Sequence, residues 1–451
     1  MSEPLGDDRQ TMTRSGWSNV IVLSAGHLLA GIGVASGIAV GGVLAEQLSG
    51  STAMAGLAQT CSILGTAVAA IPLAHLARAR GRRIALATGY VVALAGVALV
   101  FVAVSAALFP LFLAGMALFG AATAAGLQSR FAAAEGVPAS QVSRAMSIVL
   151  WATTVGAVAG PNLSQLGSEW GQRLDIEPLL GPYLFTGLGF VLAAAAIGLL
   201  MRAPRTPVVA GDTPSGPAST AEKPVRAVRG AAWREALTVP EVRLGVALTV
   251  TSHMVMVGVM VMTPVHLHHL GFGLDVVGLV LSVHIFGMYG ASPVMGWIAD
   301  RFGDIVLSAT AVVVFAAALV VGATWGAYDM IANTAALGLL GLGWSAGVIA
   351  GSGLVTKHSP PGARFSVQGG TDALMNFGAA ASAALAGILI AWGGITALNV
   401  AAACVLLPVV VAGVAGLARG RIAFRPAVPA QVAPVPDVTT TSDAAQRRST
   451  P

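Results

Sequence analysis

The stretch GWIADRFG, residues 296–303, joins two long apolar runs and carries its two charged residues, Asp300 and Arg301, side by side. The run before it covers about 275–298 and the run after it about 305–325. A helix needs roughly 20 apolar residues to cross a hydrocarbon core of about 30 Å. The stretch therefore predicts a tight polar turn between two antiparallel membrane-spanning helices.

The composition of the whole chain agrees with this prediction. The 451 residues are 56% hydrophobic and only 10% charged, with a mean hydropathy of +0.81, whereas about a quarter of the residues in soluble domains are charged. Apolar runs of sufficient length predict twelve spans, near 19–44, 52–74, 84–107, 109–129, 143–167, 182–202, 241–267, 275–298, 305–325, 329–351, 367–392 and 394–418. The first run is too late and too long for a cleaved signal peptide. The predicted fold class is an all-α integral membrane protein.

The spans divide into two groups of six. A segment rich in Pro, Ser, Thr and charge separates them and is typical of a flexible linker, and both cysteines fall inside predicted spans, which excludes a disulfide framework. The predicted organisation is a cytoplasmic N-terminal segment (1–18), a six-helix bundle (19–203), a cytoplasmic linker (204–240), a second six-helix bundle (241–418) and a disordered cytoplasmic tail (419–451).

Basic residues predict the orientation in the membrane. With a cytoplasmic N-terminus, Arg173 alone among the 24 Lys and Arg residues falls outside, as the positive-inside rule requires. The same rule accounts for the net charge of +5 without a nucleic-acid partner, because basic loops belong beside an anionic leaflet. We expect a multi-pass protein of the cytoplasmic membrane with both termini inside. Its partner is the lipid bilayer, and its default oligomeric state is a monomer.

The two bundles and their basic loops resemble the major facilitator superfamily of secondary transporters, whose loop motif is G-x-x-x-D-R-x-G-R/K-R/K. In the second half the motif residues are Gly296, Asp300, Arg301 and Gly303, and the match ends at Asp304. In the first half Gly81, Arg82 and Arg83 are kept, while Ala74 and Arg78 replace the Gly and Asp. The resemblance implies a gating latch in which a tight turn holds an Asp against an Arg and a helix N-terminus. On this evidence the latch is intact only in the second half.

A second fragment bears on the direction of transport. The run 143–167 contains Gly156-x-x-x-Gly160-Pro161, part of a motif associated with exporters of this superfamily. The same residues also suit a small-residue packing face with a proline kink. Both interpretations stay open.

Methionine and histidine side chains recur at helical spacing in two neighbouring runs. His253, Met256 and Met260 share one face of the run 241–267, and His284 and Met288 share one face of the run 275–298. At 1.5 Å per residue, Met260 lies about 10 Å and Met256 about 16 Å below the outer surface, against about 13 Å for His284 and about 19 Å for Met288. If the two helices pack as neighbours, these side chains meet near the midplane and suit Cu(I). Packing is the alternative role of the methionines.

A narrower resemblance supports the metal interpretation. MxxxM followed by HxxxM in the next helix resembles the CcoA-type copper importers, which implies that Met256, Met260, His284 and Met288 bind copper as the transported ion; no cofactor is expected. That family also includes relatives resembling riboflavin transporters. The alternative function is therefore a proton-coupled transporter or exporter of a small organic compound, riboflavin-like or drug-like. A non-transporting membrane sensor is a third hypothesis.

Other polar positions have two readings each. His266, His268 and His269 lie at the predicted outer mouth, where they collect a metal ion or are simply loop residues. Asp372, near the start of the run 367–392, takes up a coupling proton or is a first-turn acid favoured by the helix dipole. No enzyme is predicted, because the chain has neither a phosphate-binding Gly-Lys-Ser loop nor a soluble catalytic domain.

Overall fold

The computed structural model describes residues 5–134, 137, 142–202, 233–326, 329–360, 363–420 and 422. Within them the chain is helical and contains no strand, which confirms the predicted all-α fold. The helices are α1 (Leu5–Ser49), α2 (Ala55–Arg80), α3 (Arg82–Ser105), α4 (Phe109–Ala134), α5 (Val142–Arg173), α6 (Gly181–Ala195), α8 (Pro240–His269), α9 (Leu274–Tyr289), α10 (Ser292–Phe302), α11 (Asp304–Thr324), α12 (Met330–His358) and α13 (Arg364–Ala418). Short turns of helix cover Thr52–Met54, Pro178–Leu180 and Ala196–Leu200.

Each of the twelve predicted spans corresponds to a helical segment. Ten helices in the described residues are long and apolar enough to cross a membrane. That number treats α9 and α10 as one helix, counts α13 once and does not include α5. Because Gly393 and Gly394 have non-helical backbone angles, α13 is two spans joined at a bend.

The predicted flanking segments are described only in part. Helix α1 begins at Leu5, so residues 5–18 of the predicted N-terminal segment are helical and continue into the first span, which begins at Gly16. Residues 203–232, which make up most of the predicted linker, lie outside the described residues, as do 421 and 423–451 of the predicted tail.

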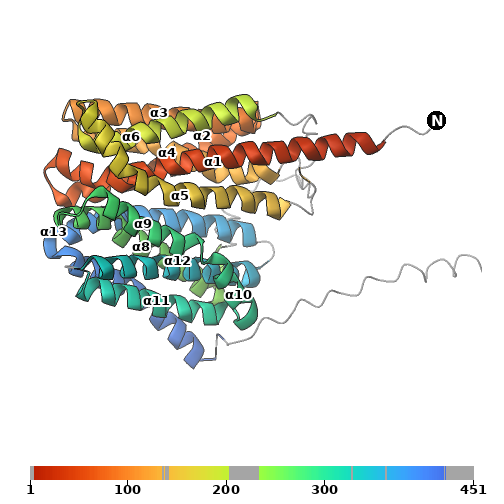
Figure 1. Cartoon of the computed structure of the whole chain (residues 1–451). Coiled ribbons are helices and arrows are strands. Elements are labelled where there is room, and N and C mark those ends of the chain that lie inside the picture. Colours follow the sequence, from red (N-terminus) through yellow and green to blue (C-terminus); the bar gives the residue numbers. More distant parts are fainter. Residues whose placement is uncertain are drawn as a thin grey trace, which may run out of the picture.

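The helices form two bundles that lie side by side (Figure 1). In the first half, α1 packs on α5 and α6, and α3 packs on α4; in the second half, α8 packs on α12 and α13, and α11 packs on α12. The first half is filled by large side chains with no more than 1% exposure, among them Tyr90, Phe119, Tyr183 and Phe190. The halves meet along a seam where α5 runs against α9 and α2 runs against α13.

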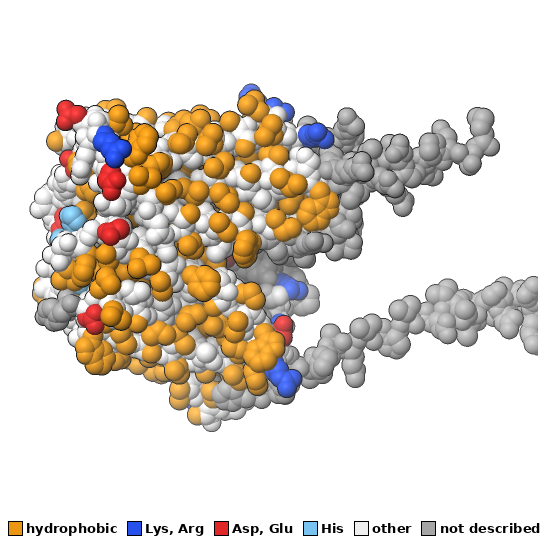
Figure 2. Space-filling view, viewed as in Figure 1, with side chains coloured by type: hydrophobic (Ala, Val, Ile, Leu, Met, Phe, Trp, Pro, Cys, Tyr) orange, Lys and Arg blue, Asp and Glu red, His pale blue; other side chains and the backbone are white. Residues whose placement is uncertain are grey.

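The two ends of the bundle carry different charges (Figure 2). We call the end where α1 and α8 finish the acidic end, because Glu46, Glu177 and Asp275 lie there. The opposite end, where α2 finishes and α3 begins with a run of arginines, is the basic end. This separation of charge is what the positive-inside pattern predicts for a membrane protein.

Two glycine turns at the basic end have nearly the same backbone conformation. Gly81, between α2 and α3, has φ 88° and ψ 159°, and Gly303, between α10 and α11, has φ 92° and ψ 159°. Glycine adopts this region without the steric cost that other residues meet there. The tight turns expected from the loop motif are therefore present in both halves.

Candidate functional site

At the acidic end, α2 and α13 touch through their backbones. Gly56 lies directly against the carbonyl group of Ala383, and a methyl group added to Gly387 would lie 2.5 Å from the carbonyl oxygen of Ala53. Next to these contacts, Thr60 Oγ1 donates a hydrogen bond of 3.0 Å to the carbonyl oxygen of Ala380. No side chain separates the two halves at this point.

A second close contact joins α5 and α9. A methyl group on Gly278 would lie 2.6 Å from the carbonyl oxygen of Pro161. One turn further along α9, Ser282 Oγ accepts a hydrogen bond of 2.6 Å from Asn162 Nδ2 and lies 2.9 Å from the carbonyl oxygen of Val158. Polar and backbone contacts thus hold the two halves together on this side of the seam too.

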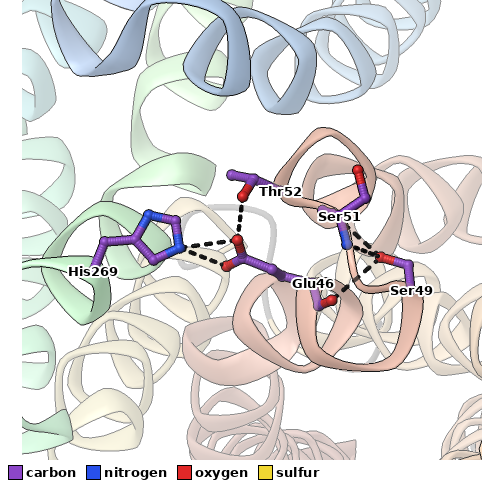
Figure 3. A network of polar contacts seen from close by, with 5 residues as sticks. All are labelled: Glu46, Ser49, Ser51, Thr52 and His269. Carbon is purple, nitrogen blue, oxygen red and sulfur yellow. Dashed lines mark hydrogen bonds and ion pairs between the residues drawn. The ribbon is translucent and has the colours of Figure 1, made fainter.

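An ion pair closes the rim of the acidic end (Figure 3). His269 Nε2, at the end of α8, lies 2.9 Å from a carboxylate oxygen of Glu46 near the end of α1, and Thr52 also hydrogen-bonds this carboxylate. The side chains of His269 and Glu46 are 45% and 18% exposed. A pair this accessible contributes at most about 1 kcal/mol. We call the contacts of α2 with α13 and of α5 with α9 at this end, together with this pair, the seal, and the backbone contacts are its main part.

Toward the basic end, the same helix faces carry exposed side chains. Trp151 follows the seam face of α5 seven residues from Val158 and is 69% exposed, and Tyr289 follows the seam face of α9 seven residues from Ser282 and is 41% exposed. Seven residues are about two helical turns, so the direction is retained. Ile71, three turns from Thr60 on α2, is 65% exposed. The halves are therefore in contact at the acidic end and separate nearer the basic end.

Three aromatic rings from three helices meet beside this separated part of the seam. Trp344 of α12 donates a hydrogen bond of 2.9 Å from Nε1 to Nδ1 of His253 on α8. The ring of Tyr289 packs edge-on against that of Trp344, with centroids 5.6 Å apart. Since the indole only donates, His253 Nδ1 is the acceptor and the neutral ring carries its proton on Nε2.

The proposed copper ligands lie in a more deeply buried region of the second half. Met256 and Met288 are 3% and 6% exposed and belong to one apolar cluster, against which the half-buried Met260 packs. His284 has no exposed surface, and its Nδ1 donates a hydrogen bond of 2.8 Å to the carbonyl oxygen of Leu337 on α12. Its Nε2 has no hydrogen-bond partner.

The packing around His284 differs from the arrangement assumed from the sequence. Helix α9 packs mainly on α5 and α12, and α8 packs mainly on α12 and α13, so α8 and α9 are only marginal neighbours. A methyl group on Gly341 of α12 would lie 3.0 Å from the backbone nitrogen of Met288. Helix α12 therefore contacts the face of α9 that was expected to face α8, because helical spacing defines a face but not the neighbour that it meets.

The three histidines near the end of α8 do not converge. His266 Nε2 donates to the carbonyl oxygen of Gly326 over 3.0 Å, His269 pairs with Glu46, and His268 lines a separate pocket. That pocket, of about 460 Å³, lies at the acidic end of the seam between α1, α5 and the α8–α9 turn. In the part of the chain that the structure describes, no three His, Cys, Asp or Glu side chains form a metal-binding group.

The two acids of the second-half loop have different surroundings. Asp300 and Arg301 are exposed, whereas Asp304 is 8% exposed and accepts a 2.7 Å bond from Lys357 Nζ of α12. In the first half, Arg83 Nε donates 2.7 Å to the carbonyl oxygen of Gly198. Each of these two contacts joins residues of a single half, as expected if the halves are apart at the basic end.

Asp372 lies on the part of α13 nearer the basic end. It is eleven residues before Ala383 on α13, which is three helical turns and keeps the same face. The residue is exposed, and Asn376 one turn on donates to its backbone carbonyl over 2.8 Å. Asp372 therefore lies on the seam face of α13, on the side where the halves separate.

Sequence comparison agrees with this architecture. The model of the Major Facilitator Superfamily matches residues 22–276 and 246–440. The chain belongs to the major facilitator superfamily. The chain is also 32% identical to the uncharacterized MFS-type transporter YdeG of Bacillus subtilis, over 87% of its own length and 91% of that protein. The riboflavin transporter RfnT of Brucella anthropi is 27% identical, with 84% and 91% covered.

Solved structures of superfamily transporters share the fold of this member. A bacterial homologue of the human lysosomal transporter Spinster superposes with a TM-score of 0.66 at 15% identity, covering 93% of this chain and 98% of that one. A D-xylose–proton symporter gives a TM-score of 0.64 at 15% identity, covering 88% and 97%. At these identities the likeness concerns the fold alone.

Several residues at the rim and along the seam were not predicted as site residues from the sequence. Glu46 was detectable as a lone acid at the end of the first apolar run. Trp151, Tyr289 and Trp344 gave no such signal, because aromatic residues are common in membrane helices facing lipid. Only the pairing of α5 with α9 shows that two of them share the seam.

Proposed function

We propose that this chain is a secondary active transporter that carries a small organic compound across the cytoplasmic membrane by alternating access. The single observation that supports this is the shape of the seam, in contact at the acidic end and separate nearer the basic end. A carrier must hold such a state and its opposite in turn. With the basic end on the cytoplasmic side, as the positive-inside rule predicts, the described state opens inward.

The cargo class rests on the exposed surface of the separated seam. Trp151, Tyr289 and the neighbouring Trp344 offer aromatic surface, which suits an organic molecule better than a hydrated ion. RfnT, a relative over most of the chain, is a riboflavin transporter. Riboflavin is therefore the first cargo to test, with drug-like aromatic compounds next.

A reversible lock tests alternating access directly. Glu46→Cys and His269→Cys, introduced together without the native cysteines, place two thiols across the rim of the acidic end. A short bis-methanethiosulfonate reagent, which links the two thiols through disulfide bonds, should abolish riboflavin transport in proteoliposomes, and a reducing agent that cleaves those disulfides should restore it. Each single-cysteine variant, treated in the same way, is the control. Transport that continues at full rate with the rim cross-linked contradicts the mechanism.

Asp372 is the residue that we propose takes up the coupling proton. An acid on the seam face of α13 meets the solution on the separated side and becomes enclosed when that side closes. Asp372→Asn should abolish stimulation of transport by a pH gradient while leaving counterflow exchange of cargo in place. Unchanged stimulation by the gradient would remove Asp372 from the coupling step.

Copper is a second candidate cargo because of one specific observation. With Nδ1 of His284 donating to a backbone carbonyl, its Nε2 lone pair is buried and unpartnered. Metal-binding histidines commonly have this arrangement, since the outer hydrogen bond fixes the tautomer. Met256, Met260 and Met288 would supply the thioether ligands. His253, His266, His268 and His269 would be accessory groups outside this ligand set, the last three at the acidic end.

The copper proposal has its own discriminating pair of variants. His284→Ala and Met256→Ala should each lower uptake of radioactive copper into vesicles at least 10-fold. Met254→Ala is the matched control, because that side chain packs on Gly378 of α13 and is not in the proposed ligand set. Equal copper uptake by all three variants and the parent would refute the site and leave the organic cargo untouched.

A further inference from the structure

Trp151 and Tyr289 lie level with each other on opposite sides of the seam. The antiparallel helices α5 and α9 are in contact where Ser282 meets Val158. Trp151 is seven residues beyond Val158 toward the basic end, and Tyr289 is seven residues beyond Ser282 in the same direction. At 1.5 Å per residue, both rings lie about 10 Å beyond the contact between Ser282 and Val158. The two helices thus carry an aromatic residue at matching depth, one from each half.

The Tyr289 ring of the second half is held by a neighbouring ring, whereas the Trp151 ring of the first half is largely exposed. Tyr289 packs edge-on against Trp344, which is fixed by its hydrogen bond to His253. Trp151 is 69% exposed. An aromatic surface that is held in one orientation loses little conformational freedom on binding. The Tyr289 ring is therefore held in one orientation, and the Trp151 ring offers accessible surface on the other side of the seam.

We propose that Trp151 and Tyr289 form a two-sided aromatic clamp that binds a planar ring of the cargo and brings the halves together on it. The clamp rests on the proposed transport of an organic compound and assigns it a substrate class, molecules with a flat aromatic ring system. Flat rings gain most from offset or edge-on contact with two other rings. Because the two residues belong to different halves, a ring bound by both favours closure at the basic end.

Binding of riboflavin to the purified full-length chain tests the clamp, with ribitol as the ring-free competitor. Trp151→Ala and Tyr289→Ala should each raise the Kd at least 10-fold, whereas Tyr289→Phe, which keeps the ring, should stay within about threefold of the parent. Trp392→Ala is the control, because Trp392 is 84% exposed near the bend of α13, away from the clamp. Unchanged Kd values for both alanine variants, or competition by ribitol, overturn the proposal.

A second measurement does not depend on how well the alanine variants fold. In a chain whose native Cys61 and Cys404 are replaced by serine, Trp151→Cys and Tyr289→Cys are introduced singly. Riboflavin at a concentration that saturates the weakened site should protect each new cysteine from a methanethiosulfonate reagent. Protection of neither or of only one overturns the clamp, as does failure of the parent to bind riboflavin. Such a result leaves alternating access standing if the cross-linked rim still blocks transport of another compound. Conversely, transport that continues at full rate with the rim cross-linked contradicts the proposed function, even when riboflavin binds to the chain.

Discussion

The seal at the acidic end makes Gly278→Ala a sharp perturbation. The added methyl would lie 2.6 Å from the carbonyl oxygen of Pro161 in the other half, and ordinary contact begins near 3.4 Å. Helices α5 and α9 would have to part by about 0.8 Å, the difference between 3.4 and 2.6 Å. Overpacking of this kind costs roughly 1 to 3 kcal/mol. Since only the sealed state has the clash, the population should shift toward opening by about 5- to 150-fold, at 1.4 kcal/mol per factor of ten.

The same helix provides the matched control. A methyl on Gly287 would lie 2.7 Å from the carbonyl oxygen of Gly338, on α12 of the same half. This clash is expected in both states because the half moves as one body. Gly287→Ala should therefore lower the melting temperature of the second half without favouring opening. Any gain in helix propensity from alanine is shared by the two variants and cancels.

Thiol labelling from the acidic end measures the shift. Val43 is 3% exposed and packs into the apolar cluster of the second half, so Val43→Cys reports opening of the seal. The native Cys61 and Cys404 are first replaced by serine. Gly278→Ala should raise the labelling rate of this cysteine at least fivefold, and Gly287→Ala should leave it within twofold. Equal rates in the two variants would refute the assignment of the seal.

Three further outcomes follow from the same contacts. Glu46→Gln should raise the Val43→Cys labelling rate by no more than about fivefold, because an exposed ion pair contributes at most about 1 kcal/mol. Gly303→Ala should lower the melting temperature, since φ is 92° there and such backbone costs about 1 to 3 kcal/mol; Gly296→Ala, helical and with open space around the added methyl, should not. Asp304→Asn should lower the melting temperature by removing the buried partner of Lys357, whereas an unchanged melting curve would show that this pair adds nothing to stability.

Most of the fold could be predicted from the sequence, because a helix that crosses the bilayer needs an apolar run of a minimum length. Helices α2 and α12 fall where the runs 52–74 and 329–351 predict, each extended by about two turns at the basic end where polar residues continue the helix. The break between α9 and α10 was missed, although Pro293 in the first turn of α10 marks it. Length alone gives no information about a break inside a span.

The candidate site was less accessible to sequence reasoning. The spacing of Met256 and Met260 places them on one face of a helix, but whether that face meets α9, α12 or the seam depends on how the bundle is assembled. The match of Trp151 with Tyr289 requires the register of α5 on α9, set by contacts more than a hundred residues apart in the chain. Long-range register of this kind has no local signature.

The seal between α2 and α13 consists of backbone atoms at Gly56, Ala383 and Gly387. Beside them the Thr60 hydroxyl bonds across to Ala380, and it also bonds to the carbonyl oxygen of Gly56 on its own helix. Glycine and alanine have no side-chain rotamers to lose when two surfaces come together. Closing this part of the seam therefore immobilises no side chain, and opening it releases none. We expect the contact to form and break with little entropic barrier, so that this part of the seal does not limit the rate of the conformational cycle.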